Sequence, residues 1–179
     1  MKIDRVSPAL DPIIDAHAPL DRVVHGIAFG EGPVRLSHTG QLYFVDILGN
    51  AIHRWKPGVG REVVVHPSGY ADGLTLDREG RIVVAGWSSR SVWRLEKDGS
   101  QTTLATHYEG KRINAPNDIV VKSDGAIYWT DPVGGLLIPG MIPEDCQQHL
   151  DFHGVFRLSP DGRTVTLVVK EGETPNGLA

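Results

Sequence analysis

The feature of this sequence that most constrains its fold is a four-strand phrase that occurs three times. X-Gly pairs stand at Thr39-Gly40, Glu79-Gly80 and Asp124-Gly125, so their glycines are 40 and then 45 residues apart. Each pair lies between two short apolar runs, which predicts an antiparallel hairpin closed by a two-residue turn. Four strands in each unit, at a period of about 40 to 45 residues, are typical of β-propeller blades. The sequence therefore predicts an all-β propeller built from four-stranded antiparallel blades.

The predicted strands follow the same order in every unit. The first strands, expected to be innermost, are VRLSH, GLTLD and DIVVKS, and the second strands are QLYFVD, RIVVAG and AIYWTD. The third and fourth strands are AIHRW with REVVVH, SVWRLEKDG with QTTLAT, and HGVFRLSPDG with RTVTLVVK. We expect an N-terminal extension over 1–20 and a propeller domain over 21–179, with blades near 31–66, 72–106 and 117–170. An insertion from Val133 to Phe152 interrupts the third unit, and a long loop of this kind is a candidate lid.

A fourth unit begins near the end of the chain. The segment TPNGLA, from Thr174 to Ala179, stands where ADGLTLD and APNDIVV stand in the earlier units, so the next blade is predicted to start at 176. About three blades and one strand cannot close a ring, and closure is what removes the open edges of the sheets. We therefore expect the chain to be a truncated part of a larger propeller.

Composition excludes several classes of partner. The net charge is −4 and no cluster of Lys and Arg is present, so nucleic acid is not an expected ligand. No apolar run reaches the roughly 18 residues that a membrane span needs, and no charged and apolar leader opens the chain. A cytoplasmic protein is therefore expected. The lone cysteine, Cys146, cannot form an internal disulfide, and it is interpreted as a free thiol in a loop.

Propeller geometry selects candidate site residues before any family is considered. The first strand of a blade lines the channel and the second runs antiparallel to it, so the start of one and the end of the other emerge on the same face. The starts of the first strands are Glu31, Asp72, Asn117 and Asn176, and the ends of the second strands are Asp46, Trp87 and Asp131. Carboxylate and amide oxygens that converge on one channel suit Ca²⁺, Mg²⁺ or Mn²⁺. The alternative interpretation is that these Asn and Asp residues only begin turns.

The stretch GKRINAPNDIVVKSDGAIYWTDP, with FGEGPV before it and TPNGLA after it, resembles the SMP-30/gluconolactonase/LRE-like family of six-bladed propellers. The resemblance covers roughly Val24 to Ala179. It implies one divalent cation, held by a Glu, two Asn and an Asp, with Glu31, Asn117 and Asn176 at the first three ligand positions. The resemblance favours Ca²⁺ and leaves Mg²⁺, Mn²⁺ and Zn²⁺ open. The fourth ligand, an Asp that also serves as general base, is expected beyond Ala179, so no catalytic residue is expected within this chain.

The resemblance also implies hydrolysis of a small-molecule sugar lactone. Asn114 and Asp131 are the candidates for hydrogen bonds to sugar hydroxyls, and Trp87 is a candidate wall of the channel mouth, with turn and packing roles as the alternatives. The segment VVAGWSSRS departs from the family, whose members often carry a charged residue and His there. Two other functions stay open: metal-dependent hydrolysis of phosphotriesters or aryl esters, and a non-catalytic propeller that binds a ligand or a protein.

Overall fold

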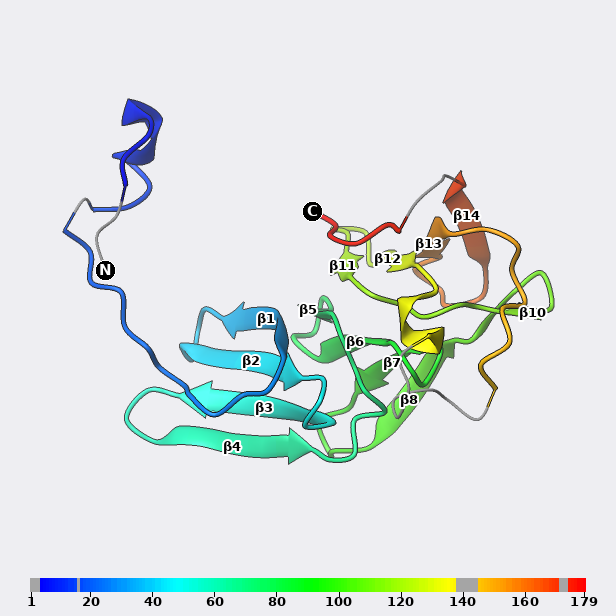
Figure 1. Cartoon of the computed structure of the whole chain (residues 1–179), viewed down its shortest axis with the longest axis horizontal. Coiled ribbons are helices and arrows are strands. Elements are labelled where there is room, and N and C mark those ends of the chain that lie inside the picture. The colour runs from blue at the N-terminus through cyan, green and yellow to red at the C-terminus, as the bar shows by residue number, and fades with distance from the viewer. Residues whose placement is uncertain (1–3, 16, 138–144, 171–173) are drawn as a thin grey trace.

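The computed structural model describes residues 4–15, 17–137, 145–170 and 174–179. Within them the chain forms three successive four-stranded antiparallel sheets, so the predicted all-β fold of four-stranded antiparallel units is confirmed (Figure 1). The first blade comprises β1 (Gly30–Leu36), β2 (Gln41–Asp46), β3 (Ala51–Lys56) and β4 (Gly60–Val65). The second comprises β5 (Leu74–Leu76), β6 (Ile82–Gly86), β7 (Ser91–Leu95) and β8 (Gln101–Ala105). The third comprises β11 (Ile119–Val121), β12 (Ile127–Asp131), β13 (Gly154–Leu158) and β14 (Val165–Lys170).

The loops between the first two strands of each blade are longer than the predicted two-residue turns. In the second blade the Asp77 N–H donates to the Arg81 carbonyl at 2.9 Å, so three residues lie between the paired ends. Gly80, the last of the three, has φ +75°, and Gly40 and Gly125 take the same left-handed conformation in the other blades. A type I turn followed by a left-handed residue gives this loop. The glycines therefore lie in the loops as predicted, but each X-Gly pair supplies only the last two residues of its loop.

The inner strands meet at glycines. Strand β5 contacts both β1 and β11. A Cβ on Gly32 would lie 2.4 Å from the Asp72 carbonyl oxygen, and a Cβ on Gly73 would lie 2.6 Å from the Asn117 carbonyl oxygen. The Gly73 N–H in fact donates to that Asn117 oxygen at 2.7 Å. The starts of the three inner strands can therefore approach one another only because side chains are absent at these two positions.

The hydrophobic core is divided into two clusters that lie between blades. One joins the first and second blades, and the other joins the second and third blades. Strand β6 contributes Ile82 and Val84 to the first cluster and Val83 and Ala85 to the second. Successive side chains of a strand point to opposite faces, so a strand covered on both faces is apolar throughout. This explains the continuous apolar run in RIVVAG.

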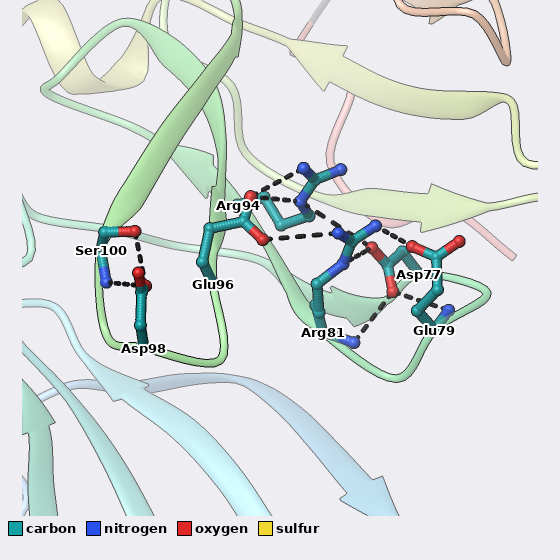
Figure 2. A network of polar contacts seen from close by, with 7 residues as sticks. All are labelled: Asp77, Glu79, Arg81, Arg94, Glu96, Asp98 and Ser100. Atoms are coloured by element: carbon teal, nitrogen blue, oxygen red, sulfur yellow. Dashed lines mark hydrogen bonds and ion pairs between the residues drawn. The ribbon is translucent and has the colours of Figure 1, made fainter.

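A network of ion pairs lies among the hairpin loops of the second blade (Figure 2). These loops are at the end of the blade away from the start of β5. The Arg81 Nε donates to Asp77 Oδ2 at 2.7 Å, and its other guanidinium nitrogens contact Glu79 and Glu96. Arg94 contacts Glu96 at 2.7 Å. Ion pairs at a protein surface contribute little to stability individually, so we assign this network a local role in shaping the loops.

Two features outside the blades bear on the site. A hairpin of β9 (His107–Tyr108) and β10 (Lys111–Arg112), which the sequence analysis did not anticipate, precedes the third blade. The insertion begins with the short helix η2 (Gly134–Leu136), and its middle, 138–144, lies outside the described residues.

The residues before β1 form an arm that extends away from the blades (Figure 1). The arm carries the short helix η1 (Pro8–Leu10), whose Ala9 N–H donates to the Ser7 hydroxyl at 3.3 Å. None of the helices in the described parts of the chain is long and apolar enough to cross a membrane.

Candidate functional site

The residues that precede the inner strands meet at one end of the blades. Asp72 comes just before β5 and is 5% exposed, whereas Glu31 at the start of β1 is exposed. The side-chain amide of Asn117, just before β11, donates from Nδ2 to Asp72 Oδ2 at 2.6 Å. Blades two and three are therefore joined by a side-chain hydrogen bond at this point, in addition to the backbone bond from Gly73 to Asn117.

Negative charge accumulates around Asp72. Burial, followed by the charges of Glu31 and Asp118, raises the pKa of Asp72 to about 7, and the hydrogen bond from Asn117 opposes the shift. Among the described residues, that amide is the group that favours the ionised carboxylate. A bound cation would balance the charge, and a donor set of carboxylate and amide oxygens fits a hard divalent ion. The residues present therefore fit the cation that the resemblance implies.

The segment that carries Asn176 docks beside the start of β11. The Thr130 hydroxyl donates to the Asn176 carbonyl at 2.8 Å, and the Leu178 N–H donates to Asp118 Oδ2 at 2.7 Å. The chain thus brings Asn176, which is exposed, next to the Asn117–Asp118 pair. The described part of the chain holds no group of three or more His, Cys, Asp or Glu side chains placed to bind a metal ion. Convergence of the Glu31, Asn117 and Asn176 oxygens on one point stays a prediction.

Asn114 and Asp131, the predicted sugar contacts, are both fully buried and bonded to each other. The backbone N–H of Asn114 donates to Asp131 Oδ2 at 2.7 Å. The side-chain Nδ2 of Asn114 donates to the carbonyls of Asp131 and Phe152. These bonds tie the start of the third blade to the end of β12 and to the end of the insertion. Each residue keeps one side-chain oxygen with no hydrogen-bond partner among the described residues. A contact of either residue with substrate stays a prediction.

Trp87, the predicted wall of the channel mouth, lies beneath the beginning of the insertion. It is 6% exposed and belongs to the core cluster that contains Leu136. A Cβ on Gly135 would lie 2.8 Å from the indole ring, so the backbone of η2 rests directly on the indole. The side chain therefore packs against the insertion, and a contact of Trp87 with substrate stays a prediction.

Two structural roles were missed by the sequence analysis. Asp46, at the end of β2, accepts the backbone N–H groups of Ala28, Phe29 and Gly49. Burial works against ionisation, yet these three bonds lower the pKa of Asp46. Asp131 occupies the same place at the end of β12. The signal in the sequence is the Asp that ends the second strand in two of the three units. In the structure each of these two residues accepts a backbone N–H from the residue 17 positions earlier.

The family comparison agrees with this geometry. The model of the SMP-30/Gluconolactonase/LRE-like region matches residues 29–179. The chain belongs to this family. One of its curated relatives is a gluconolactonase from Zymomonas mobilis, which is 34% identical over 99% of this chain and 53% of the relative.

Solved structures of the family share the fold. An X-ray structure provisionally described as a gluconolactonase has a TM-score of 0.87 and 28% identity, and the match covers 96% of this chain and 59% of that one. A gluconolactonase from Xanthomonas campestris has a TM-score of 0.74 and 32% identity, with 79% of this chain and 48% of that one covered. The chain thus spans about half the length of these family members.

Proposed function

We propose that the full-length protein hydrolyses a small sugar lactone with the help of one divalent cation bound where the inner strands begin. Ca²⁺ is the ion that we propose first. The observation that carries this proposal is the buried carboxyl of Asp72 beside the charges of Glu31 and Asp118, which a cation would balance. Family membership and the gluconolactonase relatives supply the substrate class. Glu31, Asn117 and Asn176 are the residues proposed to hold the ion.

The proposed roles divide the reaction among a few groups. The bound cation would polarise the lactone carbonyl and stabilise the charge that develops on its oxygen. An Asp beyond Ala179, expected from the resemblance, would take the proton of the attacking water. Addition of the water to the carbonyl carbon would be followed by cleavage of the ring C–O bond. The proton held by the Asp would pass to the leaving ring oxygen, so that the product is the hydroxy acid.

The experiment is a metal titration of the full-length protein. We expect hydrolysis of glucono-1,5-lactone, followed by pH-stat, to disappear when metal is stripped and to return as Ca²⁺ is added. Glu31→Gln removes a charge from the proposed ligand set, so metal affinity should weaken and turnover should fall on the order of 100-fold or more. Glu62→Gln is the matched control, because Glu62 lies in the same blade but pairs with Arg54. Wild-type turnover in the Glu31 variant would contradict the proposal.

The same samples separate the alternative functions. Phenyl acetate or a phosphotriester hydrolysed faster than any sugar lactone would assign the site to the wider class of metal-dependent esterases. Metal binding without turnover of lactone, ester or phosphotriester would favour a binding module instead.

A further inference from the structure

The side chain of Asn117 is bonded on one side to Asp72. A primary amide has two different ends, a donating NH₂ and an accepting oxygen, and an ionised carboxylate can only accept. In the structure Nδ2 of Asn117 donates to Asp72 Oδ2 at 2.6 Å. This bond fixes which end of the amide faces the second blade, and it turns the amide oxygen away from Asp72.

Asp72 is itself held firmly. Its backbone N–H donates to the Ala85 carbonyl at 2.9 Å, which anchors it to β6 of its own blade. The following residue, Gly73, donates to the Asn117 carbonyl at 2.7 Å, so the same two segments are bonded through both backbone and side chain. With 5% of its surface exposed, Asp72 has little freedom to leave this arrangement.

We propose that Asp72 is the positioning residue for Asn117, and that it orients the amide so that Oδ1 is presented to the channel cation. The inference rests on the proposed function, because it assigns Asp72 a role toward the same metal site. Asp72 acts through Asn117 rather than as a ligand of its own. Groups that orient a metal ligand in this way typically contribute about tenfold to a hundredfold in metal affinity.

A double-mutant cycle tests this assignment. Ca²⁺ affinity of the full-length protein is measured by calorimetry for the wild type, Asp72→Ala, Asn117→Ala and the double variant. We expect Asp72→Ala to weaken binding by about tenfold or more in the wild-type background. In the Asn117→Ala background the same change should alter the affinity by less than about twofold, because the amide that it orients is gone.

Two further variants complete the design. Asp72→Asn keeps an oxygen that can accept the hydrogen bond from Asn117, so it should retain more Ca²⁺ affinity than Asp72→Ala. It replaces Asp72→Ala in the cycle if the alanine variant does not fold. Asp98→Asn removes one carboxylate from an exposed loop of the same blade and should bind Ca²⁺ like the wild type.

The outcomes separate the two proposals. An equal loss of Ca²⁺ affinity from Asp72→Ala in both backgrounds would show that Asp72 contributes directly to binding the ion. No loss of affinity in either background would show that Asp72 has no role. Either outcome would overturn the positioning proposal and leave the metal site intact. If the wild type bound neither Ca²⁺ nor Mg²⁺, Mn²⁺ or Zn²⁺, the proposed function itself would be overturned, and the positioning proposal with it.

Discussion

At the scale of single residues, two aspartates of this chain show how the surroundings of a carboxyl group set its pKa. Asp46 receives three backbone N–H groups, and its pKa is lowered despite its burial. Asp131 occupies the equivalent place in the third blade, but burial dominates there and raises its pKa to about 7, against the backbone N–H of Asn114 and the charge of Arg90. The same position in the fold therefore carries an ionised group in one blade and a group that titrates near neutrality in another.

The raised pKa of Asp131 predicts a pH dependence of stability. Between pH of about 4 and about 7 the folded state holds a proton on Asp131 that the unfolded state has lost, so this residue makes folding less favourable as pH rises through that window. Asp131→Asn removes the titration. We expect the free energy of unfolding of the variant, relative to the wild type, to increase from pH 4 to pH 7 and then to level off. Urea unfolding at several pH values measures it, and a constant difference across the window would contradict the raised pKa.

At the scale of elements, a buried arginine fastens the insertion to the blades. Arg90 is fully buried at the turn between β6 and β7, and its guanidinium donates to the carbonyls of Ile113 and Asn114. Its Nη1 donates to the carbonyls of Asp145 and Gln147, at 2.8 and 2.9 Å. One side chain thus satisfies acceptors from the start of the third blade and from the end of the insertion.

Removal of this side chain should loosen the insertion before it affects the blades. Arg90→Ala leaves the buried carbonyls of Ile113 and Asn114 without this donor, and each such group costs about 1–3 kcal/mol. We expect the free energy of unfolding to fall by a few kcal/mol in sum, and amide hydrogen exchange to accelerate over 145–153 more than in β1–β4. Arg163→Ala, in an exposed loop, is the matched control. Uniform acceleration across all three blades would argue against a local fastening role.

At the scale of the whole molecule, the blades are not independent units, because each core cluster lies between two of them. Phe156 of β13 illustrates the connection. It stacks on Trp129 with ring centroids 5.6 Å apart, and it also contacts Tyr108 of the β9–β10 hairpin and Phe152 of the insertion. Removal of its side chain should therefore also destabilise the β9–β10 hairpin and the end of the insertion.

We expect Phe156→Ala to lower the free energy of unfolding by about 3–5 kcal/mol, the usual cost of a large cavity in a core. Val168→Ala, at a residue that is 50% exposed, should change it by less than about 0.5 kcal/mol. Because blades two and three share a cluster, near-ultraviolet and far-ultraviolet circular dichroism should report one transition in both variants. Two separated transitions would show that the blades unfold independently.

The sequence by itself determined the blades, because the signals for them are local. Alternating apolar runs and glycine-containing loops specify hairpins within a few residues, and their recurrence at Gly40, Gly80 and Gly125 specifies the repeat. The position of Asp72 and Asn117 at the starts of inner strands was likewise predictable, because it follows from the order of strands in a blade.

Only the tertiary structure decided which of these residues meet and how. The bond from Asn117 to Asp72 joins positions 45 residues apart, and the bonds from Arg90 reach the insertion 55 and 57 residues away. The contact between Asn117 and Asp72 depends on how closely adjacent inner strands approach, which the absence of a side chain at Gly73 permits. A periodic pattern records the spacing of strands along the chain, whereas the surroundings of a side chain are set by neighbours that this pattern does not specify.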